Sequence, residues 1–231
     1  MNRIKNTLLL IVVVLFTTAS PLHAELTAEP ANLGKLKGDL KNYHAQEYPQ
    51  QVAAKLAEAG EWIKKRAPQV KKPALVLDID ETSLSNWDEI VVNDFAYIPN
   101  GPCSFPLQMP CGAIAWDQST RATAIIPTLE VYQAAKQLGV AIFFVTGRYD
   151  DPQEKNSTEL NLWRVGYEGW ARLYMRHDHD GTVAAYKTGA REQIEAQGYT
   201  IIANIGDQQS DLDGGHAERT FKIPNPFYFI P

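Results

Sequence analysis

The chain has 231 residues, of which 45% are hydrophobic, and its net charge at pH 7 is −5. That is enough apolar sequence for one large globular domain, with room for an inserted subdomain. The acidic balance argues against a nucleic acid polymer or an anionic membrane as partner, so an anionic ligand would have to be attracted by a local cationic site.

Residues 1–24 are interpreted as a signal peptide. Arg3 and Lys5 precede the apolar run TLLLIVVVLFTTA at 7–19, and PLHAEL offers a cleavage site behind Ala24. The alternative is an uncleaved membrane anchor, which is disfavoured because a spanning helix needs about 20 apolar residues. Cleavage would change the net charge from −5 to −7. We therefore expect a periplasmic or secreted protein with no stable membrane anchor.

Helical and strand patterns alternate along the rest of the chain. Residues 25–45 are mixed polar sequence and are expected to form an arm with little core of its own, whereas 48–67 have helical spacing and ALVLDI at 74–79 is a continuously apolar strand. Further helices are expected at 127–139, 151–166 and 185–198, and further strands at 140–146, 171–175, 200–206 and 219–224. This alternation predicts an α/β fold, a parallel Rossmann-like sheet with helices on both faces.

Residues 87–120, which we call the cap segment, interrupt the alternation. They show no clear periodicity and contain prolines, aromatic residues and both cysteines of the chain, Cys103 and Cys111. In an exported protein this spacing favours a disulfide that holds a loop, because two thiols alone make a poor zinc site. The aromatic residues Trp87, Tyr97 and Trp116 either stack on a substrate base or belong to the core.

Polar side chains follow three of the expected strands. They are Asp78, Asp80 and Thr82 in DIDET, Thr146, Gly147 and Arg148 in TGR, and Asp207 and Asp211 in GDQQSD. The carboxyl ends of parallel strands meet at one edge of a sheet, so these groups should converge there. Lys187 lies near the start of the helix before the last of these strands. Thr82 is expected to support the Asp78 loop by hydrogen bonding.

Converging carboxylates favour a hard divalent cation such as Mg²⁺. A hydroxyl, a glycine-adjacent backbone N–H, Arg148 and Lys187 would form an anion cradle beside it. A cation next to an anion cradle suits phosphoryl transfer.

The ordered motifs DIDET, VTGR, YK and GDQQSD resemble the haloacid dehalogenase superfamily. VLDIDETSLSN, LNLWRVGYEGW and FKIPNPFY resemble more narrowly its exported acid phosphatases, a group that includes bacterial class C acid phosphatases and plant vegetative storage proteins. The similarity covers most of 48–231 and implies a single phosphatase domain at 25–231. Many class C enzymes are lipoproteins, whereas this chain has no lipid-bearing cysteine, so a membrane tether is not expected.

The resemblance implies a Mg²⁺-dependent acid phosphatase that acts on phosphomonoesters, and the aromatic-rich cap segment favours compact esters such as nucleoside monophosphates. Asp78 would attack phosphorus and form an aspartyl-phosphate, and Asp80 would act first as general acid and then as general base. Crowding by Asp78 and the substrate phosphate is expected to keep Asp80 protonated at the start. Mg²⁺ would be held by the Asp78 carboxylate, the Asp80 backbone carbonyl and Asp207, with Asp211 acting through water or as a support.

The same resemblance assigns Thr146, Gly147 and Lys187 to the transferring phosphoryl oxygens, and Lys187 would also offset the charge between the carboxylates. Arg148 is either a helper in this role or a member of a structural ion pair. Outside this set, His177 and His179 with Asp178 and Asp180 suggest a second metal site, although a solvated loop is favoured.

A non-catalytic storage or binding protein on the same fold is the alternative function. The presence of Asp78 favours the enzyme, because storage needs no carboxylate at that strand end. The oligomeric state stays open at this stage.

Overall fold

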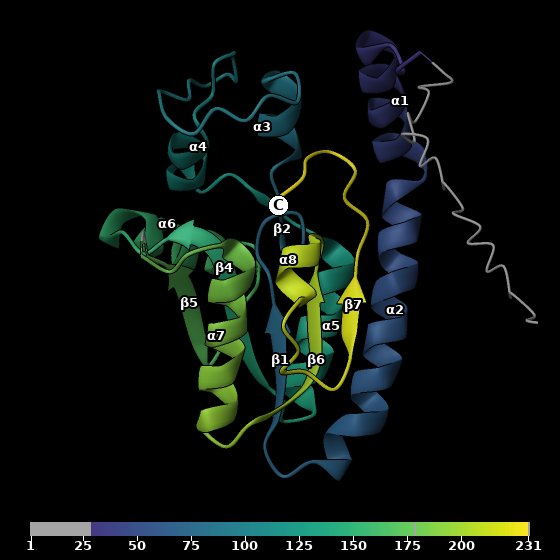
Figure 1. Ribbon diagram of the computed structural model, residues 1–231, viewed down its shortest axis with the longest axis vertical. Helices are drawn as coiled ribbons and strands as arrows, with labels where there is room; N and C mark the ends of the chain where they lie inside the picture. The colour runs from purple at the N-terminus through teal and green to yellow at the C-terminus, as the bar shows by residue number, and fades with distance from the viewer. Residues whose placement is uncertain (1–28, 178, 231) are drawn as a thin grey trace, which may run out of the picture. The chain divides into compact units, whose positions relative to one another are not determined.

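A five-stranded parallel sheet forms the centre of the computed structural model, which describes residues 29–177 and 179–230 (Figure 1). In spatial order its strands are β5 (Arg172–Arg176), β4 (Ala141–Tyr149), β1 (Pro73–Leu77), β6 (Thr200–Gly206) and β7 (Thr220–Lys222). Leu77 of β1 lies opposite Phe144 on one side and Ile205 on the other. The central strand β1 is buried at every position, as its continuous apolar sequence predicts.

Helices cover both faces of the sheet, which confirms the predicted fold class. The main ones are α2 (Tyr48–Arg66), α5 (Ile126–Gln137), α6 (Pro152–Arg164) and α7 (Val183–Ala196). Alternate residues of β1 point to opposite faces: Leu75 and Leu77 join a core cluster shared with α2, α5 and α6, whereas Ala74 and Val76 join a second cluster shared with α7. Figure 1 accordingly shows α7 in front of the sheet and α5 behind it.

The helix boundaries follow local capping chemistry. The Asp151 side chain accepts hydrogen bonds from the backbone N–H groups of Gln153 and Glu154 at the start of α6, and Thr182 caps α7 in the same way through Ala185. Residues 25–45 are expected to form an arm with little core of its own. Leu33–Gln46 form α1, a helix that was not predicted, but its lack of buried residues agrees with the expected small core. None of its residues is buried, and the partly buried Leu40 and Tyr43 pack against the larger core. The sequence of the helix therefore lacks the apolar periodicity from which a helix is predicted.

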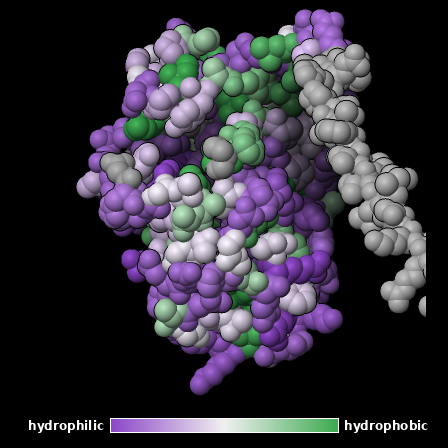
Figure 2. All heavy atoms as spheres, viewed as in Figure 1, coloured by the Kyte–Doolittle hydropathy of each residue, from purple (hydrophilic) through white to green (hydrophobic). Residues whose placement is uncertain are grey.

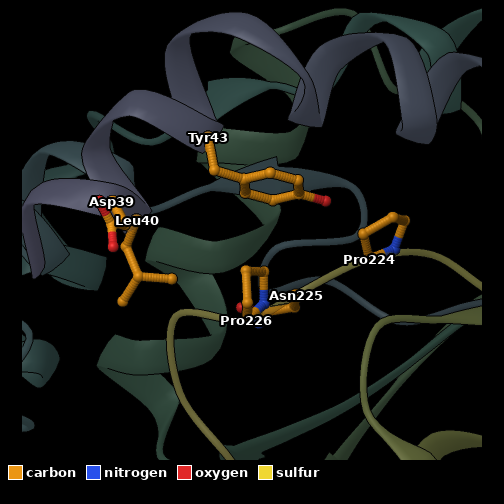
Figure 3. A pocket seen from close by; sticks show the side chains of 6 residues that line it. All are labelled: Asp39, Leu40, Tyr43, Pro224, Asn225 and Pro226. Carbon is orange, nitrogen blue, oxygen red and sulfur yellow. The ribbon is translucent and has the colours of Figure 1, made fainter. Parts of the chain in front are cut away.

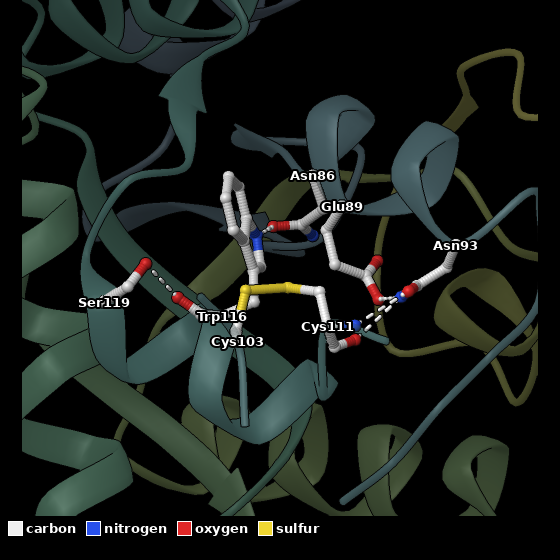
Figure 4. The surroundings of a disulfide bond; sticks show 7 residues. All are labelled: Asn86, Glu89, Asn93, Cys103, Cys111, Trp116 and Ser119. Carbon is white, nitrogen blue, oxygen red and sulfur yellow. Dashed lines mark hydrogen bonds between the residues drawn. A yellow bond between two sulfur atoms is a disulfide. The ribbon is translucent and has the colours of Figure 1, made fainter. Parts of the chain in front are cut away.

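The cap segment is flanked by a small antiparallel ladder. Strand β2 (Leu84–Ser85) pairs with β3 (Thr123–Ala124), and between them lie α3 (Trp87–Val92) and α4 (Ala113–Ser119). The disulfide between Cys103 and Cys111 is present, as predicted (Figure 4). Asn93 of the α3 end accepts from the Cys111 backbone N–H and donates to its carbonyl, which ties the disulfide loop to α3. Figure 1 shows the cap segment at the carboxyl end of β1 and β4.

Hydrophobic and hydrophilic residues are interspersed on the cap segment at the top of Figure 2, and the body below it carries mainly hydrophilic and neutral residues on this face. Large apolar side chains of the cap segment that remain exposed include those of Tyr97, Phe105, Met109 and Ile114. Within residues 29–177 and 179–230, no helix combines the length and the apolar character that crossing a bilayer requires. The expected signal peptide at 1–24 lies outside the described residues.

Glu89 of α3 makes a pH-dependent contribution to stability. Burial raises the pKa of its carboxyl from 4.5 to about 7; the hydrogen bond from Asn93 opposes the rise and the charge of Asp80 adds to it. A carboxyl with a raised folded-state pKa stabilises the fold fully below about pH 4.5, and this contribution is lost as the pH rises through about 7. Glu89→Gln should therefore reduce the stability difference between pH 5 and pH 8 by on the order of 1–2 kcal/mol.

Urea unfolding of the wild type and Glu89→Gln at both pH values measures this difference. Glu61→Gln, at an exposed position of α2, is the matched control and should leave the pH dependence of the wild type unchanged. An identical pH dependence in Glu89→Gln and the wild type would contradict the prediction.

Candidate active site

Three buried carboxylates converge at the carboxyl end of the sheet. Asp78 directly follows β1, Asp207 directly follows β6, and Asp211 lies in the short helix α8 (Gln209–Leu212). One carboxylate oxygen from each lies within 4.8 Å of the others. The strand-end argument predicts this convergence, and β-sheet pairing enforces it, since the Asp78 N–H still donates to the Ile205 carbonyl at 3.0 Å.

Lys187 of α7 lies between two of these carboxylates. Its Nζ is 2.5 Å from Asp78 Oδ1 and 2.6 Å from Asp211 Oδ1. Burial alone would disfavour the charged ammonium, but the charges of Asp211 and Asp78 outweigh it and raise the pKa of Lys187 above its usual value. Lys187 therefore stays positively charged and offsets part of the negative charge.

The cluster keeps an excess of negative charge that suits a divalent cation. Burial and then the Asp211 charge raise the pKa of Asp78 well above its usual value against the opposing effect of Lys187, and the same two causes raise the pKa of Asp207. Three carboxylates face a single ammonium, and all the candidate ligand atoms are hard oxygens, the donors that Mg²⁺ prefers. The residues present thus fit the expected ion.

Neighbouring polar groups orient the Asp207 carboxylate. Thr82 Oγ1 donates to Asp207 Oδ1 at 2.9 Å, so the expected support of the Asp78 loop by the Thr82 hydroxyl is replaced by support of Asp207. Gln208 and Asn225 each donate to Asp207 Oδ2 at 2.7 Å. The Asp78 loop is instead held by Ser83 Oγ, which donates to the Asp78 carbonyl at 2.6 Å. Sequence reasoning missed the roles of Gln208 and Asn225, which lie in the motifs GDQQSD and FKIPNPFY but carry no charge.

Gly206 allows Asp211 to approach the end of β6. A Cβ at Gly206 would lie 2.4 Å from both the Cβ and Oδ2 of Asp211, much closer than any real contact. Asp211 Oδ2 also accepts from the Gln208 N–H at 2.8 Å, which fixes the start of α8. The glycine directly before Asp207 is the sequence signal that could have identified this close approach.

Asp80 is held by a different set of groups. Arg148 Nη2 donates to Asp80 Oδ1 at 2.6 Å, Arg148 Nε lies 3.2 Å from both carboxylate oxygens, and Asn86 Nδ2 donates to Oδ1 at 2.8 Å. Burial raises the pKa of Asp80, but Arg148 and Asn86 outweigh it and lower the pKa below its usual value. The nearby guanidinium thus favours the carboxylate form of Asp80 here, and the expected protonation of Asp80 beside a bound substrate phosphate stays a prediction.

Arg148 lies in buried ion pairs. Besides Asp80, its Nη2 contacts Asp117 Oδ1 of α4 at 2.9 Å, and its Nη1 lies 3.9 Å from Glu154 Oε1 of α6. The ion pair, one of the two expectations for this residue, is present, and a role of Arg148 in binding phosphoryl oxygens stays a prediction. The Thr146 hydroxyl accepts from the Arg148 N–H at 3.1 Å. An added Cβ at Gly147 would meet Val183 at an ordinary 3.8 Å, so packing alone does not require glycine there.

The aromatic residues of the cap segment separate into two groups. Trp116 is 3% exposed and donates through Nε1 to Asn86 Oδ1 at 2.9 Å, and Trp87 stacks on His44 with ring centroids 3.5 Å apart. Tyr97 is 79% exposed. The first two therefore pack against the protein, and Tyr97 does not.

The histidine loop after β5 shows no metal-binding grouping in the described part of the chain. His177 and His179 stack on each other with ring centroids 5.4 Å apart, and the grouping with suitable ligand spacing among the described residues is Asp78, Asp207 and Asp211. Asp178 lies outside the described residues.

Two surface hollows lie near the site. One of about 390 Å³ lies between α1 and the segment after β7 (Figure 3), lined by Asp39, Leu40, Tyr43, Pro224, Asn225 and Pro226. The other, of about 610 Å³, is in the cap segment and is lined by Asp88, Phe105, Pro106, Leu107, Trp116 and Arg121. Neither is lined by the three buried carboxylates. Asn225 of the first hollow donates directly to Asp207, whereas Trp116 of the second hollow reaches Asp80 through Asn86.

Comparisons with known proteins agree with the geometry. A family model described as HAD superfamily, subfamily IIIB (acid phosphatase) matches residues 13–231, which confirms the resemblance. The chain is 43% identical to the stem 28 kDa glycoprotein of Glycine max over 120 residues, covering 50% of this chain and 46% of that protein. It is 32% identical to acid phosphatase 1 of Solanum lycopersicum over 158 residues, covering 67% and 58%. The chain thus spans about half the length of these curated relatives.

The fold is also similar to that of a solved structure. The class C acid phosphatase from Bacillus anthracis matches with a TM-score of 0.67 at 19% identity, covering 85% of this chain and 86% of that one. At this identity the match shows a common fold and supports the sheet and helix arrangement described above.

Proposed function

We propose that this chain, which belongs to the HAD superfamily, subfamily IIIB (acid phosphatase), is an exported Mg²⁺-dependent acid phosphatase. It would hydrolyse small phosphomonoesters through an aspartyl-phosphate intermediate. The observation that carries the proposal is the buried cluster in which Lys187 joins Asp78 and Asp211 next to Asp207. Such a cluster offers a carboxylate nucleophile, a cation for phosphoryl oxygens and a set of hard oxygen ligands.

The first chemical step forms a bond between an Asp78 carboxylate oxygen and phosphorus while the bond from phosphorus to the leaving oxygen breaks. The leaving oxygen takes a proton from Asp80. Asp80 must first take up this proton from solvent, at acid pH, as the substrate phosphate approaches the ion pair between Asp80 and Arg148. In the second step Asp80 accepts a proton from water, the water oxygen binds phosphorus, and Asp78 is released. Lys187 and the Thr146–Gly147 segment would bind the phosphoryl oxygens.

The carboxylates of Asp78 and Asp207 and the backbone carbonyl of Asp80 would hold Mg²⁺, with Asp211 as a support. When bound, the ion would neutralise charge on the carboxylates and on the phosphoryl oxygens. Asp211 would support the cluster through the hydrogen bonds that its oxygens accept from Lys187 and from the Gln208 N–H.

Two further features support export and a small substrate. The disulfide between Cys103 and Cys111 suits an oxidising compartment, and N-terminal sequencing of exported protein tests cleavage behind Ala24. The cap segment at the carboxyl end of the sheet favours compact esters such as nucleoside monophosphates over folded phosphoproteins.

A panel of phosphomonoesters assayed with and without EDTA tests the proposed function. We expect hydrolysis of p-nitrophenyl phosphate and of nucleoside monophosphates at acid pH, loss of activity in EDTA and recovery when Mg²⁺ is restored. A phosphodiester such as bis(p-nitrophenyl) phosphate is the control and should not be hydrolysed. No turnover of any monoester in the presence of Mg²⁺ would instead favour a storage or binding protein on the same fold.

A further inference from the structure

Two consecutive residues of α4 are connected to Asp80, each through one bridging residue. Trp116 bonds to Asn86, and Asn86 bonds to Asp80. Asp117 pairs with Arg148, and Arg148 pairs with Asp80. The cap segment is therefore connected to the proposed acid–base residue indirectly, through Asn86 and through Arg148. None of the side chains of residues 87–120 bonds directly to Asp80.

The bond from Trp116 determines which way the Asn86 side-chain amide faces. An indole N–H is a donor only, so it must bond to the amide oxygen, and it does so at 2.9 Å. The NH₂ group is thereby turned toward the carboxylates of Asp80 at 2.8 Å and Glu81 at 3.3 Å. A flipped amide would place its oxygen against both carboxylates and leave the indole N–H without an acceptor, which is costly in a buried site.

Burial makes this arrangement specific. Asn86 is 8% exposed and Trp116 is 3% exposed, so water is poorly placed to replace either bond. Asn86 lies between β2 and α3, at the base of the cap segment. Its backbone N–H also donates to Glu81 Oε1 at 2.5 Å, which fixes its position relative to the loop that carries Asp80.

Arg148 supplies the second support. Its Nη2 lies between Asp80 Oδ1 at 2.6 Å and Asp117 Oδ1 at 2.9 Å. The guanidinium is thus shared between the core and α4, and Asp80 is oriented from two directions by groups that the cap segment holds in place.

From these contacts we infer that Asn86 and Trp116 are positioning residues for Asp80, so that the cap segment forms part of the acid–base machinery. This inference rests on the proposed function. When the phosphoester bond breaks, its electron pair goes to the leaving oxygen, which takes the proton from the Asp80 carboxyl. An alkoxide needs this proton, whereas p-nitrophenolate is stable enough to leave without it. A misdirected Asp80 therefore affects the two kinds of ester differently.

The test compares kcat/KM for n-butyl phosphate and for p-nitrophenyl phosphate, since kcat/KM reports the steps up to the first irreversible bond cleavage. Trp116→Phe keeps an aromatic ring but removes the N–H donor together with part of the indole, a loss of volume that the control Trp62→Phe shares. We expect kcat/KM to fall roughly tenfold for the alkyl ester, a part of the general-acid contribution, and to stay within about twofold for the nitrophenyl ester.

Trp62→Phe is the matched control. Trp62 also donates its indole N–H, to the Ile202 carbonyl at 2.7 Å, but it has no connection to Asp80. Trp62→Phe should change kcat/KM for both esters by the same factor. Asn86→Ala removes the residue that bridges Trp116 and Asp80. It should likewise lower kcat/KM more for the alkyl ester than for the nitrophenyl ester, even if Trp116→Phe does not fold.

Equal losses for the two esters in Trp116→Phe and Asn86→Ala, or no loss for either, would overturn the inference while the phosphatase function stands. If the wild type hydrolyses neither ester, the proposed function itself fails and this inference fails with it. The two failures are distinguished by the wild-type assay.

Discussion

Asp78→Asn is expected to abolish phosphoenzyme formation and to lower turnover by roughly 10⁴-fold or more. The amide oxygen that replaces the carboxylate is a much weaker nucleophile, and Lys187 loses one of the two charges that hold it in place. The substitution also removes one of the carboxylates proposed to hold Mg²⁺, so the affinity for the ion should fall together with the activity. Rapid mixing with p-nitrophenyl phosphate, followed by intact-mass detection of the phosphoenzyme, measures the loss.

The variant should remain folded. Burial and repulsion from Asp211 raise the pKa of Asp78 in the folded state, which means that its charged form is costly there, and asparagine removes this cost. Asp213→Asn, an exposed neighbour of the cluster, is the control and should retain wild-type turnover. Turnover of Asp78→Asn within about tenfold of the wild type would contradict a covalent role for Asp78.

Asp80→Asn is expected to lower turnover by roughly 10²–10⁴-fold, the usual contribution of a general acid and base, while leaving Mg²⁺ affinity nearly unchanged. The second part follows because Asp80 is proposed to reach the ion only through its backbone carbonyl, which the substitution keeps. The first step should suffer least with p-nitrophenyl phosphate, whose leaving group needs little protonation. The second step still needs a base, so the phosphoenzyme should accumulate.

This accumulation should appear as a nitrophenol burst close to one equivalent of enzyme, and an alkyl phosphate should give no burst. The measurement is a rapid-mix comparison of the two esters, with Mg²⁺ titrated into the same variant. Equal losses in the first step for both leaving groups, or a large loss of Mg²⁺ affinity, would overturn the separate roles of Asp78 and Asp80.

The sequence by itself determines the order of helices and strands and the edge at which the site lies. Apolar residues spaced for helices and continuous apolar strands report burial directly, and the ends of parallel strands must share an edge, so Asp78 and Asp207 could be brought together without coordinates. Helix α1 was not predicted, because a helix without buried residues has no strong apolar periodicity. Its residues contact the core from one side only, so burial leaves little pattern in its sequence.

Only the tertiary structure decided which groups pair across the site. Lys187 bonds Asp78 across 109 positions of the chain, Thr82 bonds Asp207 instead of supporting the Asp78 loop, and Trp116 reaches Asp80 through Asn86. A hydrogen bond forms only within about 3.5 Å and at a suitable angle, and no local pattern specifies which of several nearby donors meets that condition. The pKa of Asp80 could not be predicted from the sequence for the same reason. It is lowered because the guanidinium of Arg148 lies next to the carboxylate, and only the fold brings the two together.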